Sequence, residues 1–332
     1  KSLDIWDKLP KSDYDHVLIW ESFHREDILF SGSECAEPNL GHIIANKAIF
    51  NAMVDQVKAL KIPVFDKQET TMLSMGDPCH EVVTQTMKIK AKLLVAADGA
   101  NSWVRSQIGI DCKQHEYNQT ALVGLVKHQS PHFKTARQRF LPGGPIALLP
   151  LQDDFHSAMV WSLPTEQAHE LQELSKQHFS TQLAKYWHHR LGSLSLQSKL
   201  NAQKLVALHA NEYGQRGVIL IGDAAHVIHP LAGQGLNIGF KDIIQLSELS
   251  EQYPLNSSSL LSEYTRRRRL DNELTLKMMD FFLALFKNEH PLSVKFRSLG
   301  MRALDGMTPV KKELSLLALG YRPNIPLIDR LL

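Results

Sequence analysis

A string of glycine, aspartate and histidine residues, GDAAHVIHPLAGQGLNIG, occupies positions 222–239. It directly follows the apolar run 218–221, which is typical of a strand buried in a parallel sheet. Asp223, at the end of that strand, can accept hydrogen bonds from the hydroxyl groups of a ribose or ribityl chain. A helix expected from Leu236 onward would point its unpaired N–H groups and positive dipole end outward. Such donors favour an electron-rich, partly anionic ring, and the pyrimidine side of a reduced flavin is one.

A second string, LLVAADGANSWVR, occupies positions 93–105 and has a similar arrangement. Its apolar part predicts another buried strand, and Asp98 and Gly99 follow where that strand ends. Because a parallel sheet delivers its loops to one edge, this turn and Asp223 are expected to share a cleft. Taken alone, an Asp-Gly pair is more often a plain turn than a site, and Arg105 also fits a surface charge.

The two strings together resemble the GD and DG motifs of the flavoprotein aromatic hydroxylases related to para-hydroxybenzoate hydroxylase. The ending HPLAGQGLNIG is most similar to the ubiquinone-biosynthesis branch. A third segment, 41–47, resembles the one that enters the helix beside the FAD phosphates, with Ala45 where the branch often has an acidic residue. The resemblance implies FAD as the cofactor and NAD(P)H as the co-substrate. The cofactor-binding residues that it implies are Asn46, Lys47, Asp98, Gly99, Arg105, Gly222, Asp223, Pro230, Gly233, Gln234, Gly235, Leu236 and Asn237.

Residues 140–151 and 157–161 resemble the substrate-domain hairpin of the same branch. Their alternating apolar residues favour a pocket for an aromatic ring with a prenyl tail, and an ordinary core sheet predicts the same pattern. No catalytic base can be assigned, since a hydrogen bond from almost any polar pocket residue could activate the ring. A metal site is not expected, because His226 and His229 have no third ligand nearby.

The pattern of the whole chain predicts an α/β fold with α+β elements. It combines a Rossmann-like FAD-binding domain that is truncated at its N-terminus, an inserted mixed or antiparallel sheet as the substrate domain, and a C-terminal helical region. The expected domains are 1–40 as a connection and edge of the substrate domain, 41–112 and 206–253 as parts of the FAD-binding domain, 113–205 as the substrate domain and 254–332 as the helical region.

Hydrophobic periodicity predicts the main elements. Antiparallel strands are expected at 120–126, 138–151 and 156–163, with turns at 142–144 and 152–154. One helix is expected at 45–60, with Ile49, Met53, Val57 and Leu60 on one face. A single amphipathic helix capped by Thr165 is expected at 165–191. Helices are expected from Ser257 onward, with breaks at Pro291, Pro309 and Pro323.

Two stretches of that helical region leave more than one interpretation open. The arginine run 266–269 predicts a solvated, salt-bridged helix face, with an anionic membrane surface or an acidic partner as the alternative. The apolar stretch 278–286 predicts a helix core or an oligomer contact, with peripheral membrane attachment as the alternative.

Length and composition limit the class of protein. With 332 residues the chain is long enough for two packed units, and 43% hydrophobic and 22% charged residues are ordinary for a globular enzyme. A net charge of +2 with evenly mixed signs gives no basis for nucleic-acid binding. Three widely spaced cysteines predict neither a disulfide framework nor a zinc site, and a reducing cytoplasm fits. No apolar run is long enough to predict a membrane-spanning helix.

Flavoproteins of this kind open with a strand, a GxGxxG turn and a helix that cradle the FAD pyrophosphate. The sequence contains no GxGxxG, and residues 1–39 have the character of the connection that follows such a unit. We therefore expect that segment to be missing and FAD to bind weakly or not at all, because charge-assisted hydrogen bonds are lost. A yellow preparation carrying one FAD per chain in its absorption spectrum would contradict this.

By resemblance, the intact enzyme hydroxylates the ring of a polyprenylated phenol in ubiquinone biosynthesis, using NAD(P)H and O₂. Hydroxylation of a small soluble aromatic compound and a non-catalytic scaffold role in a quinone-biosynthesis complex stay open as alternatives. The expected partners are the phenol substrate, proteins of that complex and a second copy of the chain. The expected location is the cytoplasm, with peripheral contact to the inner membrane as a further expectation.

Overall fold

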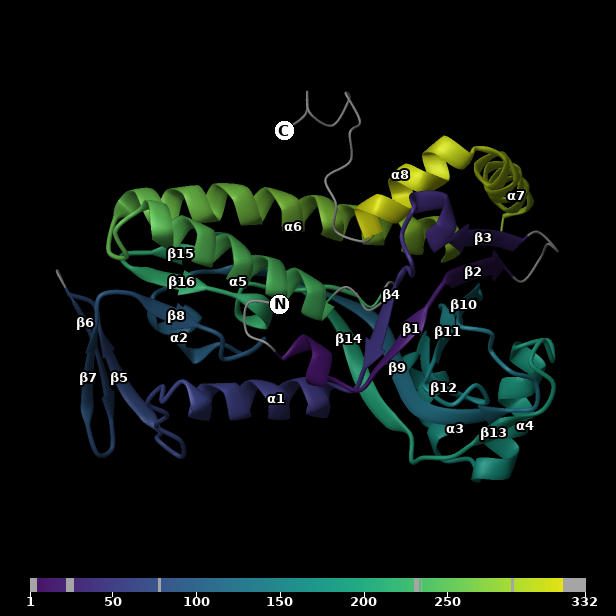
Figure 1. Ribbon diagram of the computed structural model, residues 1–332, viewed down its shortest axis with the longest axis horizontal. Coiled ribbons are helices and arrows are strands. Elements are labelled where there is room, and N and C mark those ends of the chain that lie inside the picture. The colour runs from purple at the N-terminus through teal and green to yellow at the C-terminus, as the bar shows by residue number, and fades with distance from the viewer. Residues whose placement is uncertain are drawn as a thin grey trace. The chain divides into compact units, whose positions relative to one another are not determined.

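Segments far apart in the sequence combine to form each of two units in the computed structural model, which describes residues 5–21, 27–76, 79–229, 233, 235–287 and 290–318. Unit 1 comprises Lys1–Ile62, Gln119–Lys204 and Leu283–Leu332. Unit 2 comprises Pro63–Asn118 and Leu205–Phe282. Figure 1 shows the course of the chain and the labels of its elements.

The main sheet of unit 1 has the hydrogen-bonded order β9-β12-β11-β10-β2-β3, and β13 pairs with β9. Its pairs are antiparallel except β10 with β2, so the predicted mixed or antiparallel sheet is confirmed. The strands are β2 (His16–Glu21), β3 (Asp27–Ser31), β9 (Cys112–His128), β10 (Thr135–Phe140), β11 (Ile146–Pro150), β12 (His156–Pro164) and β13 (Leu194–Leu196). A separate antiparallel pair joins β1 (Lys11–Tyr14) to β4 (Gly41–Ile44).

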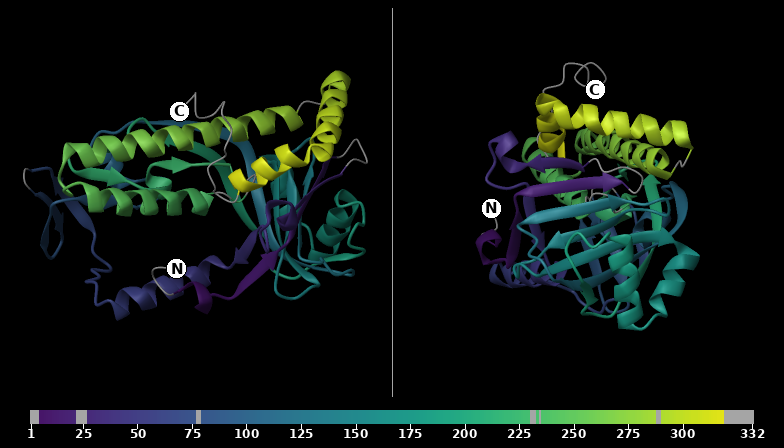
Figure 2. Two further views of the ribbon diagram at one scale, coloured as in Figure 1. Left: turned by 45° about the horizontal axis from the view of Figure 1, so that its top comes forward. Right: turned by 90° about the vertical axis from the view of Figure 1, so that its right-hand side faces the viewer.

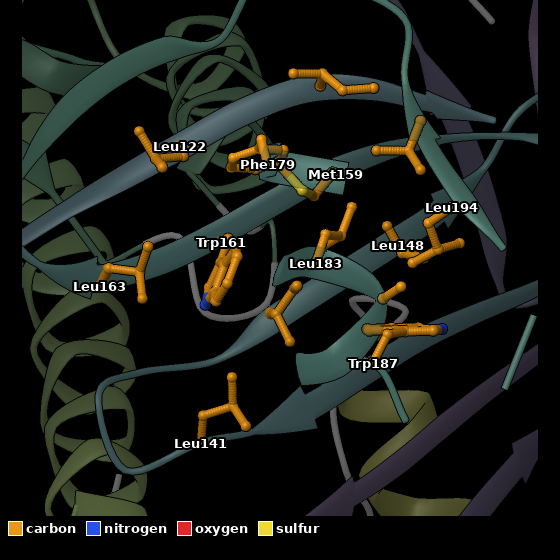
Figure 3. Packing of buried hydrophobic residues seen from close by; sticks show 14 of the residues in the cluster. Leu122, Leu141, Leu148, Met159, Trp161, Leu163, Phe179, Leu183, Trp187 and Leu194 are labelled. Carbon is orange, nitrogen blue, oxygen red and sulfur yellow. The ribbon is translucent and has the colours of Figure 1, made fainter. Parts of the chain in front are cut away.

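One face of this sheet is covered by α3 (Thr165–Gln172) and α4 (Lys176–Tyr186), as Figure 2 shows. Side chains alternate along a strand, so every second residue of β12 points to these helices. Figure 3 shows Met159 and Trp161 packing there against Phe179, Leu183 and Trp187, all of them fully buried. The core of unit 1 therefore lies between the sheet and the two helices.

The prediction of one helix at 165–191 is wrong, because a second N-cap interrupts it. The Ser175 hydroxyl accepts a hydrogen bond from the backbone N–H of His178 and starts α4 as a new helix. The predicted cap at Thr165 is also wrong: Pro164 occupies the N-cap position, and Thr165 is the first helical residue. The Thr165 hydroxyl instead lies 3.2 Å from that of Thr120 on β9.

The other predicted helices of unit 1 are present with shifted details. α1 spans Asn46–Ala59, and Leu60, expected on its inner face, is 55% exposed because it follows the last helical residue. Proline stands in the first turn of both α7 (Pro291–Gly306) and α8 (Thr308–Ala318), where its missing N–H costs no helical hydrogen bond. The expected break at Pro323 lies outside the described residues.

Unit 2 is built on a short sheet of order β15-β16-β8, in which β8 (Leu94–Ala96) and β16 (Val218–Leu220) are parallel as predicted. Every residue of β16 is buried against α5 (Gly235–Gln252) and the unit 2 part of α6 (Ser258–Lys287). The prediction that β8 is buried on both faces is wrong, because Val95 is 38% exposed. The remaining elements of unit 2 are β5 (Thr70–Ser74), β6 (His80–Thr84), β7 (Lys88–Ala91), α2 (Trp103–Gln107), β15 (Gly214–Gln215), β17 (His226–Val227) and the end of β14 (Asn201–Ala210).

Among the helices that the structure describes, none is both long enough and apolar enough to cross a membrane.

Candidate functional site

The structure brings the two acidic turns to one edge of the unit 2 sheet. β8 and β16 run in register, with Leu220 opposite Ala96, and the backbone N–H of Ile221 donates to the carbonyl of Ala96 at 3.0 Å. Both strands end at this point, so Asp98 and Asp223 follow from neighbouring strand ends. Both aspartates are exposed. The predicted proximity of the two turns is therefore present in the fold.

Arg105 joins these two turns. One terminal nitrogen of its guanidinium donates to the carbonyl of Ala224, and the other donates to the carbonyl of Ala100, each at 2.8 Å. Only 8% of the residue is exposed, so a surface charge is the wrong interpretation of Arg105. Because the guanidinium group, which we call the fork, binds both turns at once, it fixes the distance between them.

Asp98 and Ser102 shape the first turn by capping α2. The Ser102 hydroxyl accepts the backbone N–H of Arg105 at 2.9 Å, and the Asp98 carboxylate accepts that of Val104 at 3.1 Å. Both contacts satisfy N–H groups that the first turn of a helix leaves without partners. One oxygen of Asp98 thus has a structural role, and no residue in the described part of the chain donates a hydrogen bond to the other.

Asp223 has the properties of a ligand-binding carboxylate. It is exposed, and no described residue donates a hydrogen bond to its side chain in the structure. Beside it, Gly222 and Gly99 adopt left-handed φ angles of 55° and 86°, and a Cβ atom at either would meet nothing within 4 Å. The two turns therefore leave open space next to the Asp223 carboxylate. This space suits the hydroxyl-rich chain of a flavin nucleotide, which could lie close to the protein backbone at the two glycines.

The third component is the start of α5, which begins at Gly235, one residue earlier than expected. Gly235, Leu236 and Asn237 are exposed, so the helix presents its first N–H groups to a ligand. Gly233 has a left-handed φ of 62°, which a glycine adopts without strain. The predicted contacts of Pro230 and Gln234 lie outside the described residues.

Asn46 and Lys47 are the first two residues of α1 and are exposed. They belong to unit 1, whereas the other described site residues belong to unit 2. Their contact with the cofactor stays a prediction.

The predicted substrate hairpin divides into two faces. One face of β11 and β12 forms the core described above. On the opposite face, the registers place six apolar, incompletely buried residues of β9, β11 and β12 side by side: Val123, Leu125, Ala147, Leu149, Ala158 and Val160. We call this set the apolar sheet face. Core packing thus explains one half of the alternating pattern, and the other half lies on the apolar sheet face.

His229, another residue of the GD string, is fully buried. Its ring packs edge-on against Tyr117 with centroids 5.0 Å apart, and the Tyr117 hydroxyl donates to Asp280 at 2.7 Å. Burial lowers the pKa of His229 to about 4, although the Asp280 charge acts in the opposite direction. The imidazole is therefore neutral at physiological pH.

This pKa makes the protein less stable in acid. Below pH 6.5 the unfolded chain binds a proton that folded His229 does not, so stability falls as the pH drops from 6.5 toward 4. We expect His229 to account for about 2 kcal/mol of lost unfolding free energy between pH 7 and pH 5. Urea unfolding at both pH values should show this loss in the native protein and a correspondingly smaller loss in His229→Phe. Equal losses in the two proteins would contradict it, because all other histidines are common to both.

Two charged residues beside the turns were not found from the sequence as site residues. Asp242 on α5 and Arg268 on α6 are buried and pair at 2.7 Å. For Arg268 the predicted solvated face is wrong, whereas Arg266 and Arg267 do bind Glu263 in partly exposed salt bridges. The missed signal was spacing: Asp242 follows buried Ile238 by four residues, and Arg268 follows buried Tyr264 by four, so each lies on a core-facing stripe.

Comparisons with known proteins show the family of the chain. The family described as FAD binding domain matches residues 5–277. The 3-demethoxyubiquinol 3-hydroxylase of Escherichia coli is 32% identical over 330 residues, covering 96% of this chain and 84% of the relative. The mitochondrial ubiquinone biosynthesis monooxygenase of Xenopus tropicalis is 32% identical over 352 residues, covering 91% and 75%. The crystal structure of p-nitrophenol 4-monooxygenase from Pseudomonas putida has the same fold, with a TM-score of 0.73, 18% identity and coverage of 96% and 84%. The chain therefore belongs to the FAD binding domain family, in the branch of FAD-dependent aromatic hydroxylases that includes the enzymes of ubiquinone biosynthesis.

Proposed function

We propose that this protein hydroxylates the aromatic ring of a polyprenylated phenol in ubiquinone biosynthesis. The observation that carries the proposal is the pair of acidic turns at one sheet edge, tied together by Arg105. The names of the Escherichia coli and Xenopus relatives support the substrate class. FAD, when bound, supplies the redox chemistry that couples NAD(P)H and O₂ to ring hydroxylation.

Each part of the site has its own task in this proposal. Asp223 accepts hydrogen bonds from hydroxyl groups of the flavin nucleotide. Gly222 and Gly99 have no side chains, so the nucleotide can approach the protein backbone closely at both turns. The exposed N–H groups from Gly235 to Asn237 would donate to a bound flavin and so favour its reduced, more negative state. The further proposed cofactor contacts are Asn46, Lys47, Asp98, Arg105, Pro230, Gly233 and Gln234.

The apolar sheet face of unit 1 supports a hydrophobic substrate. Its six side chains are all aliphatic and lie side by side on three neighbouring strands, so they offer contact area to a prenylated ring, with Lys127 and His156 beyond them on the same face. A small soluble aromatic would need a buried cation or hydroxyl group for its own polar substituents. For this reason we rank the prenylated phenol above the soluble compound.

Product analysis tests the choice of substrate. The protein, supplied with excess FAD and NAD(P)H under ¹⁸O₂, is incubated in parallel with short-chain prenylphenols and with the same phenols lacking the prenyl chain. We expect a mass increase of one ¹⁸O-labelled hydroxyl group, mainly on the prenylated compounds. Preferred hydroxylation of the unprenylated phenols would favour the soluble-substrate alternative, and NAD(P)H consumption without labelled product from either set would argue against a hydroxylase.

Contact with a membrane surface forms a further part of the proposal, because a prenylated substrate partitions into lipid. Phe281, in the apolar stretch 278–286 of α6, is 62% exposed and offers an aromatic side chain to a lipid surface. Sedimentation with anionic lipid vesicles, comparing the native protein with Phe281→Ser, tests this point. Self-association and contact with other quinone-biosynthesis proteins stay predictions.

A further inference from the structure

Behind the Gly222 turn, one buried carboxylate accepts three hydrogen bonds. Asp242 on α5 is fully buried. Its Oδ2 accepts from the backbone N–H of Gly222 at 2.8 Å and interacts with the Nε2 atom of His226 at 2.6 Å. Its Oδ1 accepts from the Nε–H of Arg268 at 2.7 Å. The turn, β17 and α6 are thus all attached to α5 at a single side chain.

Arg268 is held in place by its own neighbours. Its two terminal nitrogens donate to Asp271 at 2.5 Å and to the Asn272 side-chain oxygen at 2.7 Å, and Asn272 donates to the Tyr213 hydroxyl at 3.0 Å. Burying a charged pair is costly, and apolar residues of the same volume often stabilise a core equally well or better. A fully hydrogen-bonded cluster at this position is therefore better explained by the geometry that it imposes than by stability alone.

The charge state of Asp242 suits this role. Burial alone would raise its pKa, but the hydrogen bond with His226 and the charge of Arg268 outweigh that effect and hold the pKa below the usual value. The group is an ionised carboxylate at neutral pH, which can only accept hydrogen bonds. It therefore holds the Gly222 N–H in one direction.

Asp242 acts on Asp223 through the preceding residue, Gly222. The Gly222 N–H donates to Asp242, and the Gly222 carbonyl accepts from the N–H of Ala225 at 2.9 Å, so the glycine is fixed on both sides in its left-handed conformation. We propose that Asp242, supported by Arg268 and His226, is a positioning residue for flavin binding: it orients the Gly222 peptide and thereby sets the direction in which Asp223 presents its carboxylate. This inference rests on the proposed role of Asp223 in binding FAD.

A double-mutant cycle tests the inference. Asparagine has the shape of aspartate but replaces one acceptor with a donor, so Asp242→Asn leaves Gly222, His226 or Arg268 without its acceptor. We expect the Kd for FAD, measured by quenching of flavin fluorescence, to rise about tenfold in Asp242→Asn. If Asp242 acts through Asp223, the same substitution should change the Kd less than twofold in an Asp223→Ala background. Additive effects in the cycle would overturn the inference.

Tyr264→Phe is the matched control for general loosening of the core. It removes a buried hydrogen bond from the Tyr264 hydroxyl to the carbonyl of Leu220, 3.1 Å long, on the strand that leads into the same turn. It leaves the contacts of Asp242 intact, so the Kd for FAD should stay within about twofold of the native value. If this variant weakens FAD binding as much as Asp242→Asn does, the effect comes from the core and the positioning role is wrong.

A milder variant covers the case in which Asp242→Asn does not fold. His226→Phe keeps an aromatic ring, somewhat larger than imidazole, and the Arg268 pair, and it removes one hydrogen bond, so the Kd should rise about threefold and amide exchange at Gly222 should become faster. Unchanged affinity and unchanged exchange would overturn the inference. The outcomes also separate the positioning role of Asp242 from the proposed function. If the single substitution Asp223→Ala leaves FAD binding unaffected, the flavin site itself is misassigned. If Asp223→Ala weakens binding while both other variants do not, only the positioning role fails.

Discussion

Replacing Asp223 with alanine is expected to weaken FAD binding by about 100-fold while leaving the free energy of unfolding nearly unchanged. The carboxylate is exposed and accepts no hydrogen bond from a described residue, so the folded protein does not depend on it. A bound nucleotide, in contrast, would lose charge-assisted hydrogen bonds from its hydroxyl groups, each contributing about 1.5–3 kcal/mol. Flavin fluorescence titration measures the first quantity, and urea unfolding measures the second.

Two further variants sharpen this test. Asp223→Asn keeps one acceptor atom and should weaken binding only about tenfold, because a neutral acceptor forms weaker hydrogen bonds than a carboxylate. Glu251→Ala removes another exposed carboxylate, at the opposite end of α5, and should leave the Kd unchanged. If Glu251→Ala and Asp223→Ala had equal effects, loss of negative charge from unit 2 would explain the result and Asp223 would have no specific contact.

Much of the fold could be predicted because its elements obey local rules. The parallel pair β8 and β16 follows from two short apolar runs that end in aspartate, and the inserted sheet follows from strict alternation between turns. The helix at 165–191 could not be predicted correctly, because its apolar spacing continues through the break at Ser175. A side-chain cap that interrupts a periodic pattern is a single hydrogen bond, and spacing alone does not reveal it.

The sequence predicts where the two acidic turns lie along the chain, but it does not predict which side chains support them. The sequence points to Asp98 and Asp223 because each stands beside a glycine directly after a short apolar run, where a strand of a parallel sheet ends. The supporting residues Arg105, Asp242 and Arg268 are charged, and charged side chains are expected at the surface. Their burial depends on partners from distant segments. Arg105 binds the carbonyl of Ala224, and Asp242 pairs with Arg268. No local pattern contains that information.

Arg105→Ala is expected to reduce the free energy of unfolding by about 3–5 kcal/mol. The substitution removes two short hydrogen bonds from a charged donor and leaves the carbonyl groups of Ala100 and Ala224 without that partner, at about 1.5–3 kcal/mol for each bond. Because the fork holds the two turns together, FAD binding should weaken in the same variant. Urea unfolding gives the stability change, and amide exchange at 98–105 and 222–224 should show that both turns open more often.

Arg105→Lys and Arg266→Ala serve as controls for this prediction. Lysine keeps the charge but can reach only one of the two carbonyl groups well, so it should recover about half of the lost stability. Arg266 is exposed and bound to Glu263 in a surface salt bridge, so its removal should cost far less stability than the removal of Arg105. If lysine restored full stability, a positive charge alone would suffice at this position and the fork would not be needed. If Arg105→Ala cost no more than Arg266→Ala, the two turns would be held together by strand pairing alone, and their spacing would not depend on this side chain.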